Sequence, residues 1–274
     1  MWLDDSQWLE KRDLVLDQPC VNTPGALGFT PDQRTMPFLA RLGAFITNPI
    51  SRSPRQPTAN RACLPFSGGF LLHTGLPNPG VTRAIRLFKH GWAGAPLPII
   101  VHLLADSPES IAEMVRKLEG LENVLAVELG IHPAAEPETL EKILQAAYGE
   151  LPIILCLSPE QLPLLLNPVR ALQPAAVHLM PPRGVLPDPR GTLIAGRLYG
   201  PATLPLVFAA ARTLVTAQVP VIAGGGICTG AQAQAFLDLG VKAISLGSGL
   251  WGVDPEAIFP DSENENLDHC SHEG

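Results

Sequence analysis

A run of glycines near the carboxyl end of the chain has the clearest chemical use. The segment PVIAGGGICTG places Gly224, Gly225 and Gly226 after a short apolar run and before a helix start at Thr229. Glycine leaves backbone N–H groups uncovered, and a helix N-terminus carries partial positive charge. This pattern predicts a site for a phosphate group.

A second set of donors follows at the end of the next apolar run. Gly247, Ser248 and Gly249 offer backbone N–H groups and one hydroxyl. Phosphate sites between neighbouring strand ends recur in barrels of alternating strands and helices. An isolated glycine triplet would be interpreted as a tight turn, but the two motifs together favour phosphate.

Histidine is the side chain suited to proton transfer near neutral pH, with an unperturbed pKa of about 6.5. His132, in ELGIHPA, follows an apolar run and is a candidate base; the alternative is that it caps a short loop without chemistry. His73 lies in a long connection and could contact a ligand. His102 and His178 fall inside apolar runs, where a histidine buried in the core is the more common interpretation.

Strands and helices must position these residues. Eight apolar runs, each a candidate strand, alternate along the chain with segments of helical spacing. This alternation is typical of a parallel sheet covered by helices, and one (β/α)8 barrel needs about 250 residues. We predict a single TIM barrel of class α/β over residues 1–259 and an acidic disordered tail over 260–274. The predicted strands are 14–21, 43–47, 98–103, 124–129, 152–157, 176–180, 220–223 and 243–246.

The connection over residues 51–79 is too long for a simple strand-to-helix loop. In a barrel it lies at the carboxyl ends of the strands, where ligands bind, so we predict a lid after the second strand. Asn78 lies in its LPNPG turn.

Composition limits the partners. Lys and Arg number 19 against 26 Asp and Glu, a net charge of -7 that argues against nucleic acid and anionic membranes. The amino terminus lacks the apolar core of a signal peptide, and the five cysteines form no CxxC pair. We therefore expect a cytoplasmic protein with a small-molecule substrate, no metal site and no membrane contact, and a homodimer is one possible assembly.

The segment LGAFITNPISRSPRQPTANRACLPFSGGFLLHTGLPNPG resembles the dihydroorotate dehydrogenase family, whose TIM barrel binds FMN. The matching elements are ITNPIS, SPR, SGG and GLPNPG. The glycine block resembles the one that holds the FMN phosphate in the family, and GRLYGPA resembles a segment beside the flavin. The resemblance extends over roughly residues 13–259.

The resemblance implies an FMN-dependent oxidoreductase of the CH–CH donor class, as in pyrimidine biosynthesis. It implies a catalytic cysteine or serine at about the point where this chain has His132, so His132 is the substituted candidate for the base. Asn78 is the substrate contact that remains from the family pattern, and His73, next to Leu72, is a candidate new contact. The implied FMN contacts are Thr23, Gly25, Asn48, Gly200, Gly225, Gly226, Gly247 and Ser248.

Several departures from the family pattern concern its chemistry. The two lysines of the family are replaced by Asn48 and Cys156, and its ring-binding asparagines by Leu72 and Gly130. Because a cation beside a flavin stabilises its reduced form, these losses change the expected chemistry. The substrate is expected to have diverged. The remaining cations near the barrel mouth are Arg52, Arg55, Arg183 and Arg197.

Two other functions stay open. The missing lysines favour a catalytically degenerate barrel that acts as a phosphate-ligand-binding or partner subunit. A barrel enzyme that grips a sugar phosphate or pyridoxal phosphate is the third possibility, although no lysine is placed for a Schiff base.

Overall fold

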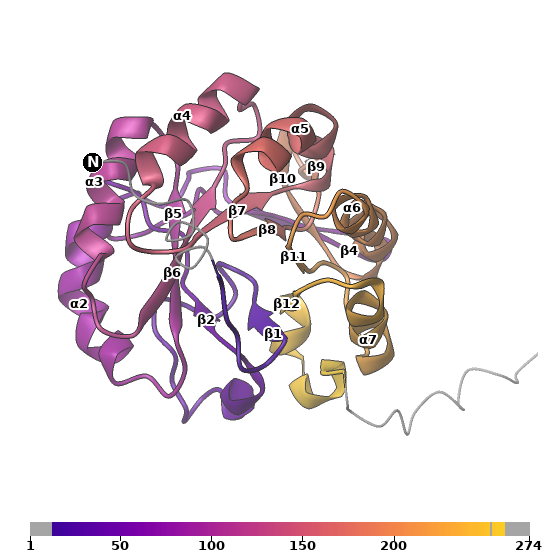
Figure 1. Cartoon of the computed structure of the whole chain (residues 1–274). Helices are drawn as coiled ribbons and strands as arrows, with labels where there is room; N and C mark the ends of the chain where they lie inside the picture. Colours follow the sequence, from indigo (N-terminus) through magenta and orange to yellow (C-terminus); the bar gives the residue numbers. More distant parts are fainter. Residues whose placement is uncertain (1–12, 253, 261–274) are drawn as a thin grey trace, which may run out of the picture.

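The chain folds into a barrel of eight parallel strands with helices around it (Figure 1). This computed structural model describes residues 13–252 and 254–260. The strands follow one another in the order β1-β12-β11-β8-β7-β6-β5-β2. Each overlaps one of the eight apolar runs, so the predicted TIM barrel is confirmed. Their bounds are β1 Cys20–Asn22, β2 Phe45–Ile46, β5 Ile99–Leu104, β6 Val124–Gly130, β7 Ile153–Leu157, β8 Ala176–Leu179, β11 Val221–Ala223 and β12 Ala243–Leu246.

The barrel closes between β1 and β2, which are joined by a single parallel bridge from Val21 to Ala44. The buried side chain of Asn22 extends this short ladder. Its Nδ2 donates to the carbonyl of Ile46 at 2.7 Å, and its Oδ1 accepts from the Ile46 N–H at 2.8 Å. A side-chain amide thus replaces a backbone peptide, and each such bond contributes about 1 kcal/mol net.

Six α-helices cover the outside of the barrel within the described residues. Ser107 caps one of them by accepting from the Ser110 N–H at 3.2 Å. Gly240 ends another in the left-handed conformation, with φ 98°. Both residue types are typical of these helix ends. The helices are α2 Val81–Ala93, α3 Pro108–Leu118, α4 Pro137–Ala147, α5 Leu162–Leu172, α6 Leu204–Thr216 and α7 Gly230–Leu239.

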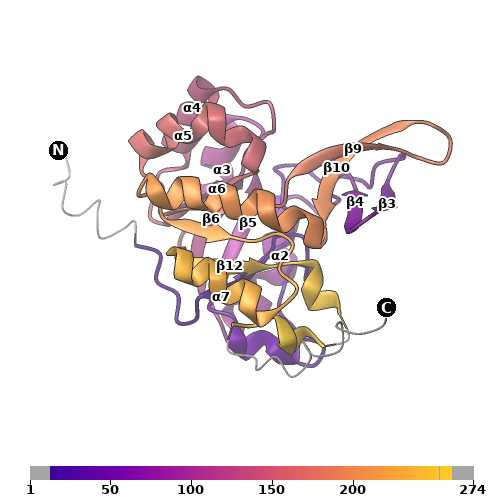
Figure 2. The same ribbon diagram turned by 90° about the vertical axis from the view of Figure 1, so that its right-hand side faces the viewer.

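A four-stranded antiparallel sheet projects from one end of the barrel (Figure 2). Its order is β3-β4-β10-β9, with bounds β3 Ala62–Phe66, β4 Gly69–His73, β9 Arg183–Pro187 and β10 Leu193–Tyr199. The hairpin β3-β4 lies within the predicted lid. The hairpin β9-β10 comes from the connection after β8, for which the sequence analysis predicted no strand. We call this sheet of two hairpins the lid sheet.

The interior of the barrel is layered. Its middle is filled by buried apolar side chains, including Ile46, Ile100, Ala126, Ile154, Ala176 and Ile222. Side chains alternate between the two faces of a strand, so the residue two positions further along points inward again. On four successive strands these next residues are His102 on β5, Glu128 on β6, Cys156 on β7 and His178 on β8. A polar layer therefore lies above the apolar one, towards the carboxyl ends of the strands.

Among the described residues, no helix is long and apolar enough to cross a membrane. The barrel core extends to Phe259, which is fully buried. Residues 261–274, which make up almost all of the predicted tail, lie outside the described residues.

Candidate functional site

A cavity of about 620 Å³ opens at the carboxyl ends of the barrel strands, below the lid sheet. It is lined by the ends of β5 to β8, by the loop after β1 and by strands β4, β9 and β10. Its volume suits a small ligand. The polar and charged residues that line it are Arg55, His73, Thr74, His102, Asp106, His132, Ser158, Gln161, Arg183, Arg197 and Tyr199.

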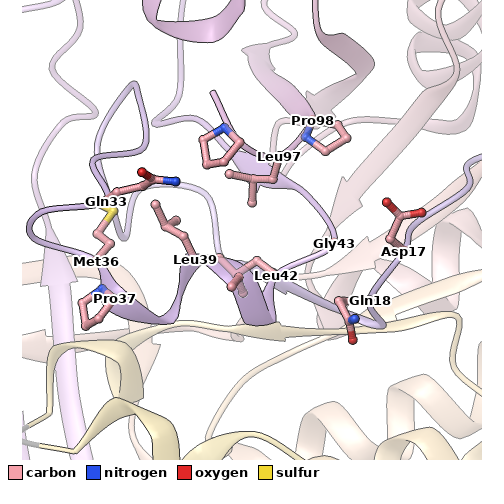
Figure 3. A pocket seen from close by; sticks show the side chains of 12 residues that line it. Asp17, Gln18, Gln33, Met36, Pro37, Leu39, Leu42, Gly43, Leu97 and Pro98 are labelled. Carbon is pink, nitrogen blue, oxygen red and sulfur yellow. The ribbon is translucent and has the colours of Figure 1, made fainter. Parts of the chain in front are cut away.

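A second cavity, of about 390 Å³, is lined in part by residues that precede β1, β2 and β5, at the amino ends of these strands. Figure 3 shows Leu39, Leu42 and Leu97 on its walls, with Asp17 and Gln18 at one side. No histidine, cysteine or basic side chain is among its lining residues in the described structure. Barrel enzymes carry their chemistry at the carboxyl ends of the strands, so the first cavity is the candidate site.

The floor of the candidate site contains a buried cluster of two histidines and one carboxylate. His102 Nδ1 lies 2.6 Å from Glu128 Oε1, and His178 Nδ1 lies 2.7 Å from Glu128 Oε2. Glu128 and His178 are fully buried, whereas His102 lines the cavity. We call these three residues the His–Glu–His cluster.

The cluster keeps Glu128 ionised. Burial acts to raise the pKa of Glu128, but the positive charge and the hydrogen bonds that the two histidines offer it outweigh burial, so this pKa lies far below its usual range. The neighbouring thiol responds in the opposite direction. Burial and the Glu128 carboxylate raise the pKa of Cys156, which therefore stays protonated.

Two arginines of the lid sheet form a wall of the cavity. Arg183 on β9 and Arg197 on β10 are opposite each other in the antiparallel register. Burial and the charge of Arg197 lower the pKa of Arg183. Among the described residues, neither guanidinium forms a salt bridge, whereas Arg55 at the rim pairs with Asp106 at 3.0 Å. The wall therefore carries positive charge that a bound anion would neutralise.

The structure brings His73 and His132 to the same cavity, as the sequence analysis expected of ligand contacts. His132 Nδ1 accepts a hydrogen bond from the Ala134 N–H at 3.2 Å. The neutral ring therefore carries its proton on Nε2. Asn78 does not line the cavity; its Oδ1 accepts from Ser51 and its Nδ2 donates to the Leu76 carbonyl, so it holds the lid turn together.

The two glycine motifs lie at the ends of neighbouring strands, β11 and β12. Gly225 and Gly226 have φ values of 145° and 74°, which other residues rarely adopt. The N–H groups of Gly225, Gly226 and Ser248 have no acceptor within the parts of the chain that the structure describes. Unpaired N–H groups on adjacent strand ends form a donor set for an anion. None of these residues lines the cavity itself.

Of the other predicted FMN contacts, Gly25 lines the cavity, whereas Thr23, Asn48 and Gly200 do not. Thr23 Oγ1 bonds to Ser245 Oγ at 2.9 Å, and a Cβ on Gly247 would lie 3.1 Å from the same Thr23 oxygen. Asn48 Oδ1 accepts from the Gly28 N–H at 3.1 Å and so fixes the loop after β1. That loop brings Gly25 to the cavity wall.

Gly200 lies where the lid sheet meets the barrel. Its φ is 110°, and a Cβ there would lie 2.5 Å from the Cα of Gly69. Beside it, Tyr199 stacks on Phe70 with ring centroids 5.3 Å apart, and Trp251 packs against both rings. This aromatic group joins the lid sheet to the segment that follows the second glycine motif.

Glu128 is the residue of the site that sequence reasoning missed, together with the roles of His102 and His178. The available signal was a polar side chain at matching depth in three buried strands. Taken singly, each looked like an isolated polar residue in an apolar run. Only the curvature of the barrel shows that β5 and β8, which are not adjacent, both reach the carboxylate on β6.

No protein-family model matches the chain. The chain is 29% identical over 270 residues to the dihydroorotate dehydrogenase B (NAD(+)) catalytic subunit of Maridesulfovibrio salexigens, covering 90% of this chain and 88% of that protein. It is 25% identical over 274 residues to the corresponding subunit of Geobacter sulfurreducens, covering 91% and 88%.

The fold is similar to that of the DHODH of Eimeria tenella, solved in complex with ferulenol. The TM-score is 0.70 at 12% identity, with 92% of this chain and 87% of that chain covered. At this identity the likeness supports the fold alone.

Proposed function

We propose, on the premise that this chain is a divergent relative of the dihydroorotate dehydrogenases, that it is a flavin oxidoreductase of the CH–CH donor class with FMN as its cofactor. The relatives carry the name of that activity. The proposed substrate is a small anionic molecule and not necessarily dihydroorotate.

One observation in the structure itself supports FMN binding, independently of the names of the relatives. The N–H groups of Gly225, Gly226 and Ser248 lie at adjacent strand ends without an acceptor among the described residues. An unpaired backbone donor is costly unless water or a ligand satisfies it. A phosphate group fits this donor set, so these residues are proposed to hold the FMN phosphate, together with Gly247.

The flavin would supply the redox chemistry by accepting a hydride, and the protein would bind and orient the reactants. Thr23, Gly25, Asn48 and Gly200 are proposed to lie along the cofactor between the phosphate end and the cavity. Their backbone and side-chain groups are already fixed by internal contacts, which favours a preorganised site.

The arginine wall supports an anionic substrate. Arg183 and Arg197 face the cavity without a carboxylate partner among the described residues. The two asparagines that the resemblance places against a polar ring are replaced, and Leu72 and Gly130 line the cavity in their positions. Selectivity for a polar ring depends on such hydrogen bonds. The substrate is therefore proposed to have diverged while keeping a negative charge.

His132 is the proposed residue for proton transfer, with His73 as a substrate contact. A neutral His132 offers Nε2–H to the cavity because Nδ1 is bonded to Ala134. In this arrangement Nε2–H donates a hydrogen bond and not a proton, because a neutral imidazole is a very weak acid. His132 acts as a base when Nδ1 releases the Ala134 amide and takes up the proton.

The decisive experiment is to denature the purified protein and identify the released chromophore. We expect FMN. Ser248→Asp should abolish FMN binding, because a carboxylate would repel the phosphate. Thr216→Asp, which adds the same charge at the exposed carboxyl end of helix α6, should bind FMN normally. If the protein is colourless and FMN does not raise its thermal stability, the proposal is excluded. The remaining function is then that of a catalytically degenerate barrel that acts as a phosphate-ligand-binding or partner subunit.

A further inference from the structure

We propose that His102, held by Glu128 and protonated on both ring nitrogens, supplies the positive charge and the hydrogen-bond donor that the cavity floor offers to a bound ring. Where that ring is the flavin, the proposal rests on the function proposed above. The role is that of a cofactor-contacting residue, with Glu128 and His178 as positioning residues.

The geometry gives His102 one fixed end and one free end. Nδ1 is held by Glu128 Oε1 at 2.6 Å, while the His102 backbone N–H donates to Thr47 Oγ1 at 3.1 Å. Nε2 lies against Gly130, where a Cβ would come within 2.6 Å of it. Among the described residues Nε2 has no hydrogen-bond partner, and Gly130 provides no side chain to cover it.

With both Glu128 oxygens accepting hydrogen bonds from imidazole Nδ1–H groups, charge balance requires one imidazolium in the cluster. Glu128 is a fully buried carboxylate, and an unpaired buried charge costs several kcal/mol. With both rings neutral the cluster would carry one net negative charge. A single added proton makes it neutral.

The surroundings decide which ring takes that proton. His178 Nε2 is buried and has no partner within the described residues, so a proton there would be an unsatisfied donor. His102 Nε2 borders the cavity, where water or a ligand accepts the bond. The neutral cluster is therefore His102 imidazolium, Glu128 carboxylate and neutral His178 with its proton on Nδ1.

The charged groups around His102 leave this assignment in place. Cys156 on β7 is a protonated thiol and contributes no charge. Arg197 on β10 lies close enough to influence Cys156, but its Nη1 donates to the Pro181 carbonyl at 3.0 Å, on the wall and not the floor. Asp106 at the rim is already paired with Arg55.

The cluster also accounts for a replacement seen in the sequence. Cys156, which stands where the resemblance places a lysine, forms a contact with Glu128. A lysine at that position would neutralise the same carboxylate. With cysteine at this position the positive charge of the lysine is absent, and the imidazolium of His102 supplies it instead. The net charge around Glu128 is therefore the same, but the cation lies on β5 and not on β7.

The proton assignment is tested by NMR of the purified protein labelled with ¹⁵N-histidine at pH 7, with or without flavin. We expect both ring nitrogens of His102 to be protonated and His178 to carry a proton on Nδ1 only. The ring signals of His102 are identified by their disappearance in His102→Gln. If that variant does not fold, they are assigned through their connectivity to the backbone signals of His102. An unprotonated His102 Nε2 would overturn the proposal even if FMN is bound.

The role towards the ring is tested by the midpoint potential of bound FMN, which needs no substrate. His102→Gln should weaken binding of reduced relative to oxidised flavin about tenfold, equivalent to a fall of about 30 mV for a two-electron couple. His102→Lys should restore most of it, and His90→Gln, on the exposed end of α2, should change nothing. An unchanged potential in His102→Gln would refute the role.

Metal analysis of the same sample separates the proposal from its main competitor. His102, Glu128 and Cys156 have ligand atoms within 4.8 Å of one another and could hold an ion. Stoichiometric zinc would overturn the proton assignment. Absence of FMN together with the expected NMR signals would refute the proposed function and the role towards the flavin, and leave the charge state of the cluster established.

Discussion

His132 and His102 reach the same cavity from two different structural settings. His132 lies on the loop after β6, and its ring is bonded to the N–H of Ala134, two residues along the same loop. His102 lies inside β5 and is bonded to Glu128 on the next strand, which also binds His178. One histidine is positioned by local backbone, the other by three strands of the barrel.

The difference separates two kinds of contribution. A loop histidine can be replaced without disturbing the barrel, so its effect should appear in chemistry alone. A histidine in a buried ionic cluster affects stability and chemistry together, because its partner loses a counter-charge when it is removed.

Glu128→Ala should have the largest effect on stability. It leaves two buried imidazoles without their carboxylate, and removing one partner of a buried pair costs about 3–5 kcal/mol. Urea unfolding measures the change. Glu138→Ala, which breaks an exposed pair with Lys142 on α4, is the control and should leave the free energy of unfolding unchanged. Equal stability of both variants would mean that the cluster is not formed.

His132→Ala should act on the reaction instead. If the protein is an active oxidoreductase, the rate of flavin reduction by substrate should fall about a hundredfold, the usual contribution of a positioned acid–base group. Stability should change by no more than about 0.5 kcal/mol, because exposed loop positions contribute little. A wild-type rate would transfer the acid–base role to another residue, with His73 as the next candidate.

Gly130→Ala connects the two settings, because Gly130 is two residues before His132 and lies against His102. The added Cβ would come 2.6 Å from His102 Nε2 and force the ring to move. Overpacking of this kind costs about 1–3 kcal/mol. Gly120→Ala tests the alternative that loss of glycine is itself harmful, since its φ is 75° but no atom lies near its Cβ. A smaller loss in Gly130→Ala than in Gly120→Ala would argue against the close contact.

The dependence of stability on pH should show the smallest effect. The pKa of Glu128 is lowered in the folded protein, so its contribution is present above the unfolded value of about 4.3 and is lost as pH falls below it. The slope contributed by one group is at most about 1.4 kcal/mol per pH unit. Glu128→Gln should reduce the loss of unfolding free energy at acid pH, whereas His132→Ala should leave that loss unchanged. Parallel curves for wild type and Glu128→Gln would contradict the lowered pKa.

The strand pattern, the capped start of α3 and the glycine end of α7 were predictable because each depends on local spacing and on conformations that few residues adopt. The hairpin β9-β10 was not. Its exposed edge residues, among them Val185 and Leu193, alternate weakly, and the hairpin is stabilised by pairing with β4, which is far away in the sequence. The predicted homodimer and the roles of the predicted site residues stay predictions.

The sequence by itself determined the barrel and the glycine motifs, because both follow from residue type and spacing along a short stretch. Only the tertiary structure decided that His102, Glu128 and His178 form one cluster. Their contacts join strands 26 and 50 residues apart, and no local pattern encodes which inward-facing side chains meet. The physical reason is that closing the barrel brings the polar residue of each strand to the same depth, where a buried carboxylate must find its charge partner.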